Sequence, residues 1–150
     1  MPDGNGSIVA ARLSDDFTKL LTEPRHLFYA RDAAWARTGV TDGPFLYRTD
    51  GGKLFMTWSN YGKKEYVVAL ASSPSGELFG PWVQEGLIYE KGMLKGEPYD
   101  GGHGMIFRRH DGTLMLSFHA ANKPEENDIR EHLVLLPIAE ADGILKLIEN

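Results

Sequence analysis

Apolar positions along the chain fall in short runs that alternate with polar positions, and Gly, Asp, Asn and Pro separate these runs. This pattern is typical of β-strands joined by turns, whereas an amphipathic helix repeats its apolar positions every 3.6 residues. The clearest hairpin joins Phe45–Arg48 to Lys53–Trp58 through the turn Thr49-Asp50-Gly51-Gly52. The pattern therefore predicts an all-β fold.

The same hairpin pattern returns 60 residues later, in Met105–Arg109, His110-Asp111-Gly112 and Thr113–Phe118. With one gap at Gly52, Leu54 aligns with Leu114 and Ser59 aligns with His119. A second similarity covers other strands: Ile8–Ser14 matches Tyr66–Ser72 at a spacing of 58, and Leu27–Tyr29 matches Leu87–Tyr89 at a spacing of 60. The repeating unit is therefore four strands long.

Four-stranded units at this spacing are typical of the blades of a β-propeller. We expect one partial propeller domain over 1–150, with an outer half blade at 6–37, a blade at 40–95 and a blade at 100–149. Two and a half blades cannot close a ring, so we expect preceding blades or a second copy of the chain to complete it. The turn-like start at 1–6 supports preceding blades. A single antiparallel sandwich is the competing interpretation.

Composition narrows the classes of partner. The 150 residues carry a formal charge of −5 and a pI of about 5.5, and no basic stripe is present, so we expect no nucleic-acid partner. No apolar run reaches the length of about 18–20 residues that a membrane helix needs. The absence of cysteine excludes a thiolate metal site and a cysteine nucleophile. No signal peptide is recognised, and because one could lie upstream of residue 1, localisation stays open.

Candidate chemistry lies where each blade begins. The residues that precede the first strand of a blade converge on the propeller axis, and here they are Val40–Pro44 and Asp100–Gly104. The repeat alignment gives Asp42 and His103 equivalent places, 61 residues apart and each beside glycine. Glycine permits close approach of backbone or ligand. We expect both side chains to face one pocket at the axis, although each segment is also compatible with an ordinary turn.

These residues also carry a family resemblance. Asp42-Gly43-Pro44-Phe45-Leu46-Tyr47, then Gly80-Pro81-Trp82 and then Gly102-His103-Gly104-Met105 resemble the C-terminal portion of a glycoside hydrolase family 43 protein. The resemblance implies a five-bladed β-propeller that hydrolyses arabinofuranosyl or xylosyl linkages of plant-type oligosaccharides or polysaccharides with inversion. It assigns Asp42 as the general acid and places His103 near the channel centre, where in some members this histidine helps to hold calcium. It implies no required cofactor.

Two departures from the family pattern matter. Asp42 stands where the family has glutamate, and aspartate is one methylene shorter. The segment that would carry the general base has no match in this chain, so we expect the chain alone to be inactive. A non-catalytic carbohydrate-binding propeller is the alternative function. A propeller that binds a protein on its rim is a third interpretation, which the Gly-His-Gly element disfavours.

Other residues have both a structural and a functional interpretation. Trp35 is a candidate for stacking on a sugar, or else a tryptophan packed between blades. His119 ends the second strand of the last unit and is a second candidate for substrate binding, or else a surface histidine. Trp58 and Trp82 lie in repeated strand patterns and are predicted core residues. The run 123–128 is predicted to be a solvated loop, long enough to form a rim over the pocket.

Overall fold

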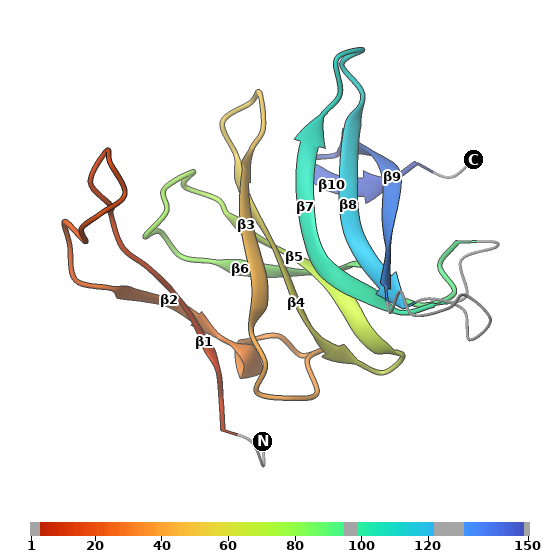
Figure 1. The fold of residues 1–150 in the computed structure, drawn as a ribbon, viewed down its shortest axis with the longest axis horizontal. Coiled ribbons are helices and arrows are strands. Elements are labelled where there is room, and N and C mark those ends of the chain that lie inside the picture. The colour runs from red at the N-terminus through yellow and green to blue at the C-terminus, as the bar shows by residue number, and fades with distance from the viewer. Residues whose placement is uncertain (1–3, 95–98, 122–130, 149–150) are drawn as a thin grey trace.

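The computed structural model describes residues 4–94, 99–121 and 131–148, which form three antiparallel sheets in chain order (Figure 1). The first sheet pairs β1 (Ser7–Ala10) with β2 (Arg25–Tyr29), and the short 3-10 helix η1 (Ala30–Asp32) follows. The second sheet contains β3 (Asp42–Arg48), β4 (Leu54–Gly62), β5 (Glu65–Ser73) and β6 (Val83–Tyr89). The third contains β7 (Gly101–Arg108), β8 (Leu114–Ala121), β9 (Glu131–Ala141) and β10 (Ile144–Leu147).

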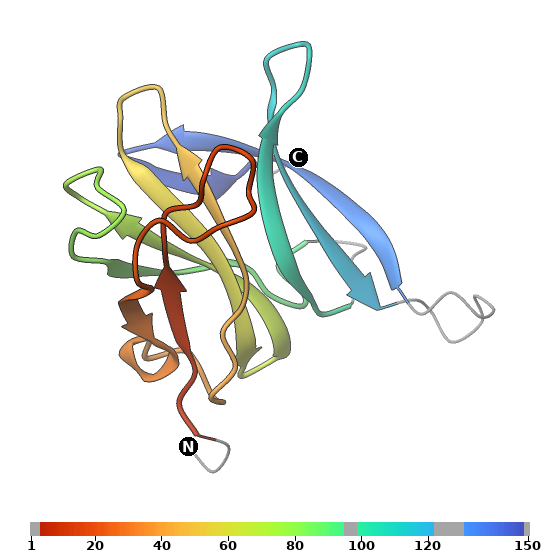
Figure 2. The same cartoon turned by 60° about the vertical axis from the view of Figure 1, so that its left-hand side comes forward.

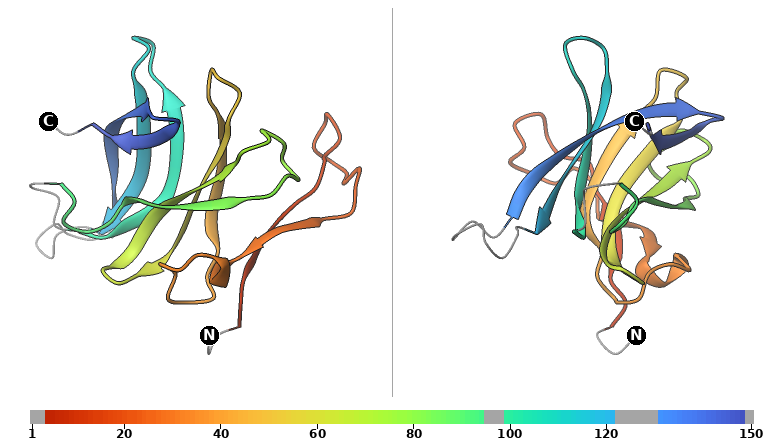
Figure 3. Two further views of the ribbon diagram at one scale, coloured as in Figure 1. Left: turned by 180° about the vertical axis from the view of Figure 1, so that it is seen from behind. Right: turned by 90° about the vertical axis from the view of Figure 1, so that its right-hand side faces the viewer.

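The sheets stand one after another in an open arc, with β3 and β7 side by side at its centre (Figures 1 and 2). In both four-stranded sheets the strands follow sequence order outward from this central strand. The views from behind and from the side show the same arrangement, without the two facing layers of a sandwich (Figure 3). The predicted all-β, partial propeller fold is confirmed, and the sandwich interpretation is wrong. The predicted loop at 123–128 lies outside the described residues.

The middle sheet is buried on both faces because successive side chains of a strand point to opposite sides. On β4, Met56 and Trp58 pack with Ile8 and Phe28 of the first sheet. Phe55, from the opposite face of β4, joins a larger cluster with β5, β6 and the third sheet. That cluster includes Val68, Leu70, Ile88, Ile106, Leu116, Phe118, Val134 and Ile138. Burial of such side chains contributes about 1.5–3 kcal/mol each, so these two cores hold the three sheets together.

The central strand β7 lies directly on the middle sheet. The Thr57 hydroxyl, buried on β4, donates a hydrogen bond of 2.5 Å to the Gly104 carbonyl of β7. A Cβ added at Gly104 would come within 2.6 Å of Val68 on β5. Glycine at 104 therefore permits the close approach that brings the beginning of β7 next to the beginning of β3.

The β3–β4 and β7–β8 hairpins repeat at a constant spacing of 60. Phe45 pairs with Thr57 and Met105 pairs with Ser117. At the two turns, the guanidinium groups of Arg48 and Arg108 each donate a hydrogen bond of 2.9 Å to the carbonyls of Gly52 and Gly112 respectively. The gap predicted at Gly52 is therefore unnecessary, because the two turns have the same length.

The first sheet repeats the outer strands at a different spacing from the predicted one. Tyr29 pairs with Ser7, and Tyr89 pairs with Val68. When Tyr29 is matched to Tyr89, Ser7 therefore matches Val68 at a spacing of 61, instead of the 58 expected from the apolar run. Apolar runs tolerate such shifts because many of their residues are interchangeable by hydrophobicity alone.

The part of the chain that the structure describes contains no helix with the length and apolar character needed to cross a membrane.

Candidate active site

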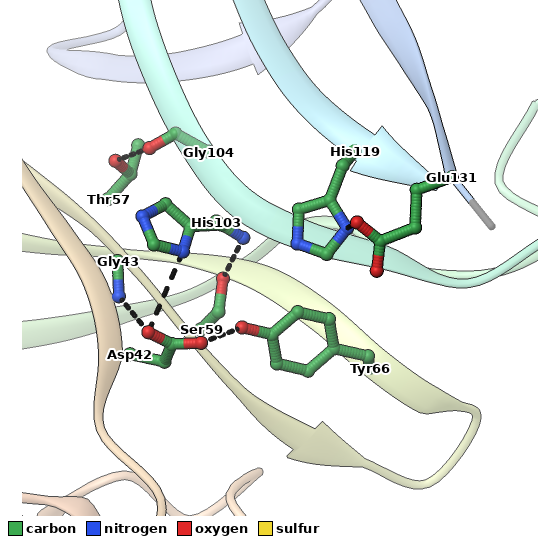
Figure 4. Close-up of polar contacts among 9 residues, drawn as sticks. All are labelled: Asp42, Gly43, Thr57, Ser59, Tyr66, His103, Gly104, His119 and Glu131. Carbon is green, nitrogen blue, oxygen red and sulfur yellow. Dashed lines mark hydrogen bonds and ion pairs between the residues drawn. The ribbon is translucent and has the colours of Figure 1, made fainter. Parts of the chain in front are cut away.

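Asp42 is the first residue of β3 and pairs with Ser59 of β4 (Figure 4). A β-bulge separates this pair from the next one, which joins Phe45 to Thr57. The bulge places two residues of β3 opposite one residue of β4 and directs Asp42 to the same face as Ser59. The carboxylate accepts hydrogen bonds on both oxygens: the Gly43 N–H donates to Oδ1 at 2.8 Å, and the Tyr66 hydroxyl donates to Oδ2 at 2.5 Å.

A buried asparagine fixes the loop that leads to Asp42. The Asn60 amide nitrogen donates to the carbonyl oxygens of Thr38 at 3.0 Å and Val40 at 2.6 Å. Its oxygen accepts from the Thr38 hydroxyl at 2.7 Å. Asn60 is fully buried, so these bonds satisfy both ends of an amide that would be costly to bury unpaired. The loop therefore delivers Asp42 from a fixed position.

His103 lies opposite Asp42, on β7. Its N–H donates to the Ser59 hydroxyl at 2.9 Å, and its Nδ1 is 3.6 Å from Asp42 Oδ1. Its backbone has a φ of +58°, in the left-handed region that non-glycine residues seldom occupy. The structure therefore brings Asp42 and His103 together.

The predicted equivalence of Asp42 and His103 is wrong by one residue. Each central strand has a bulge, and the ladders match Asp42 to Gly102 and Gly43 to His103. The backbone agrees, because Gly43 has a φ of +54°, close to that of His103. Asp42 holds the first position of the bulge in β3, and His103 holds the second position of the bulge in β7. Because β3 and β7 lie side by side, their two side chains still approach each other.

Tyr66, near the start of β5, was not predicted as a site residue. Its N–H donates to Asp100 Oδ2 at 3.1 Å, and its ring lies against Gly102, where an added Cβ would be 2.0 Å from Tyr66 Cε1. Burial, followed by the hydrogen bond and charge of Asp42, raises the pKa of the Tyr66 hydroxyl. The hydroxyl therefore stays protonated and donates to Asp42 across the neutral range.

His119 lies on β8 across the pocket from Asp42. Its Nδ1 is 3.2 Å from Glu131 Oε2, at the start of β9. Its ring centroid is 5.9 Å from that of Tyr66 and 6.2 Å from that of His103. Glu131 orients the imidazole, so that the rest of the ring is directed toward His103 (Figure 4).

Asp42, Tyr66 and His119 meet at a cavity of about 400 Å³. Its lining residues are Val40, Asp42, Tyr61, Tyr66, Asp100, Gly101, His119 and Glu131. Carboxylates, phenols and an imidazole converge in it, whereas apolar side chains are few. Such a lining suits a hydroxylated ligand, because each hydroxyl of the ligand needs a hydrogen-bond partner.

His103, a predicted substrate-binding residue, is not among the residues that line this cavity, so of the pair Asp42 and His103 that was expected to face one pocket, Asp42 alone lines it. Trp35, the third predicted substrate-binding residue, is not among the lining residues either. It packs against the core between the first and second sheets, with its ring centroid 4.6 Å from that of Trp58. Trp58 is fully buried and Trp82 packs against the same core, as predicted for both. Of the predicted site residues, the structure brings together Asp42, His103 and His119.

The described residues around His103 do not support the calcium site that the family resemblance allowed. Calcium takes about 6–8 oxygen ligands. Within 4–94, 99–121 and 131–148, no group of three or more His, Asp or Glu side chains is arranged to hold a metal ion. The carboxylate of Asp42 lies beside the His103 ring, with Oδ1 3.6 Å from Nδ1. These residues do not form a calcium site by themselves.

Sequence reasoning missed Tyr66 and Glu131, and it placed Asp100 at the axis only as part of the segment 100–104, without a role of its own. Tyr66 begins an apolar strand, so its pattern indicates a core position. Glu131 follows a polar run and resembles a solvated strand end. Their position along the chain could have identified them. Each lies where a strand begins or ends at the same edge of the sheets as Asp42, and polar residues at that edge face the pocket.

The model of the family "Glycosyl hydrolases family 43" matches residues 2–145. None of the curated proteins gives a significant match. An endo-arabinase from Bacteroides thetaiotaomicron is 39% identical with a TM-score of 0.72, over 91% of this chain and 48% of that one.

Two further solved structures share the fold at lower identity. A thermostable family-43 glycoside hydrolase is 24% identical with a TM-score of 0.76, over 94% of this chain and 46% of that one. An alpha-L-arabinofuranosidase from Lactobacillus brevis is 23% identical with a TM-score of 0.70, over 91% and 45%. The chain thus spans about half the length of these structures.

Proposed function

Because the chain belongs to glycosyl hydrolases family 43, we propose that it supplies one wall of the active site of a glycoside hydrolase. The substrate is an arabinofuranosyl or xylosyl linkage in a plant-type oligosaccharide or polysaccharide, and hydrolysis proceeds with inversion. The names of an endo-arabinase and an alpha-L-arabinofuranosidase among the similar structures support this substrate class. The polar lining of the cavity supports a sugar ligand. No cofactor is required for this chemistry.

Asp42 is the general acid. The observation that carries this role is its carboxyl group at the cavity, held by hydrogen bonds on both oxygens and placed before Gly43-Pro44 as in the family pattern. An acid at this place protonates the oxygen of the leaving sugar as the glycosidic bond breaks. The shorter aspartate requires that the scissile oxygen lie closer to β3 than it would beside a glutamate.

The general base comes from elsewhere in the ring. An inverting enzyme needs a second carboxylate about 6.5–9.5 Å from the first, with room for the attacking water. The other carboxylates of the cavity have partners: Asp100 accepts from the Tyr66 N–H, and Glu131 contacts His119. The chain alone is therefore inactive, and either preceding blades of the same protein or a second copy completes the site.

His119 and His103 contribute to substrate binding. His119 lines the cavity and is oriented by Glu131, so its imidazole is positioned for a sugar hydroxyl. His103 lies beside Asp42 with its side chain half exposed. Trp35 was a candidate for stacking on a sugar, and its place between the sheets supports the packing role instead.

The test compares Asp42→Asn with the unmodified protein, in the full-length product of the gene that encodes this chain. Aryl arabinofuranosides and xylosides with poor leaving groups should lose about 10²–10⁴-fold in turnover, because they need protonation most. Substrates with good leaving groups should lose much less. Asp50→Asn is the matched control, because Asp50 lies at a hairpin tip with its side chain 93% exposed. Equal losses on both substrate types would reject the general acid role.

A non-catalytic carbohydrate-binding propeller is the second candidate function, favoured by aspartate in place of glutamate at residue 42. It predicts binding of arabino- or xylo-oligosaccharides without hydrolysis by the full-length protein. Calorimetric titration together with product analysis separates the two functions. Turnover that disappears in Asp42→Asn while binding persists supports the enzyme.

A further inference from the structure

We infer that Tyr66 is the positioning residue for Asp42, holding the carboxyl group at one place in both its protonated and its ionised form. This inference rests on the proposed role of Asp42 as general acid. It adds a residue to the reaction that neither the sequence pattern nor the family resemblance identified.

The two hydrogen-bond donors on Asp42 differ in what they can do. The Gly43 N–H is 2.8 Å from Oδ1, and this bond weakens when Oδ1 carries the acid proton, because the hydroxyl oxygen of a carboxylic acid is a weak acceptor. The Tyr66 hydroxyl, 2.5 Å from Oδ2, donates to the carboxylate, and it also donates to the acid protonated on Oδ1, because Oδ2 is then the carbonyl oxygen. A general acid passes through both forms in every turnover, and the bond from Tyr66 is kept in both.

Tyr66 is itself held rigidly. Its N–H is tied to Asp100, and its ring is pressed against the backbone of Gly102. The ring centroid lies 5.2 Å from that of Tyr61 and 5.9 Å from that of His119. Because the Tyr66 ring is fixed by backbone and by aromatic neighbours, its hydroxyl can hold the carboxyl group of Asp42 in one place.

Tyr66 does not act as the acid. Burial and the charge of Asp42 raise the pKa of its hydroxyl, which makes loss of that proton harder. The proton that reaches the leaving sugar comes from Asp42, and the Tyr66 proton remains in the hydrogen bond between them. The function of Tyr66 is thus geometric.

The first test uses Tyr66→Phe in the full-length gene product, since phenylalanine keeps the ring and removes only the hydroxyl. For substrates with poor leaving groups we expect kcat to fall about 10- to 100-fold with little change in KM, because one charge-assisted hydrogen bond is lost in the transition state. Substrates with good leaving groups should be affected less. Tyr47→Phe is the control: its hydroxyl accepts from Arg108 at 3.2 Å, outside the cavity.

A double-mutant cycle identifies the target of Tyr66. If Tyr66 acts through Asp42, Tyr66→Phe should cause no further loss in the Asp42→Asn background. A loss as large as in the unmodified background would overturn the inference and leave the proposed function intact. If Asp42→Asn itself causes no loss that depends on the leaving group, the proposed function fails instead.

A second measurement needs no activity and uses the 150-residue chain. Ultraviolet titration follows tyrosine ionisation, and Tyr66→Phe identifies the signal of Tyr66. Asp42→Asn should move that signal to lower pH, because it removes the carboxylate charge that opposes ionisation of the Tyr66 hydroxyl. An unchanged signal would overturn the inference, since the two side chains would then not be bonded in solution.

Discussion

Gly43 and His103 occupy the same bulge position in successive sheets, and each has a left-handed backbone. Glycine accepts this conformation without strain, whereas a side chain there costs of order 1 kcal/mol or more. The histidine bears that strain while its N–H bonds Ser59 and its ring faces Asp42. Gly43 has a separate constraint, because His103 lies against it.

Gly43→Ala should lower the free energy of unfolding by about 2–4 kcal/mol. An alanine Cβ would meet the Cα, Cγ and Cδ2 atoms of His103 at 2.8 Å, in addition to the backbone strain. Gly112→Ala is the control, because Gly112 has a φ of +87° and nothing within 4 Å of an added Cβ. Urea unfolding measures both. Equal losses would show that the contact with His103 contributes nothing.

The strands that carry the site are longer than their apolar cores. β4 continues past Trp58 through polar residues to Gly62, because Ser59 and Asn60 find buried hydrogen-bond partners in β7 and in the loop before β3. A polar residue on a strand end thus serves as a tether. In this sheet the tethers place Asp42 and His103.

Asn60→Ala should cost about 1–3 kcal/mol of stability, because it leaves the part-buried carbonyl oxygens of Thr38 and Val40 without this donor. Hydrogen exchange should become faster in the loop around 38–41, which Asn60 holds. Ser117→Ala is the control, because the Ser117 hydroxyl makes one bond of 3.3 Å to the Met105 carbonyl at an exposed position. Unchanged exchange in the loop would show that the loop is ordered by other contacts.

The fold could be predicted from the sequence because its signals are repeated over many residues. The repeated hairpins and the order of the sheets follow from apolar alternation and turn residues, which every strand shows. The match of Asp42 to His103 failed because a bulge inserts one residue without any fixed composition. Tyr66 and Glu131 escaped prediction because their roles depend on neighbours that are distant in sequence.

The second and third sheets have corresponding faces, and this face is buried in the second sheet but exposed to solvent in the third. On the second sheet, Phe45, Tyr47 and Phe55 pack against the third. At the matching face of the third sheet, Met105 is 47% exposed and Leu133 on β9 is 66% exposed. Ladder pairing puts Leu135 opposite Ser117, and hence on the same face as Met105. An apolar sheet face of this kind favours association with another sheet.

The isolated chain should therefore self-associate at high concentration, with a light-scattering mass above the 16.7 kDa of one chain. The double variant Leu133→Lys, Leu135→Lys should return the mass to that of a monomer, because charge opposes burial of this face. Val83→Lys, at an exposed position of β6, is the control and should leave association unchanged. A monomeric mass for the unmodified chain at all concentrations would contradict the expectation.

The bulge in β3 also determines which side of the sheet Asp42 belongs to. Side chains alternate along a strand, so in a regular ladder Gly43 would share a face with Phe45, and Asp42 would point to the opposite side, toward the first sheet. Without the bulge the same residues would pair Gly43 with Ser59, and the carboxyl group of Asp42 would point away from Tyr66 and His103. The one extra residue of a bulge can thus decide on which side of a sheet a catalytic group lies, without any change in the group itself.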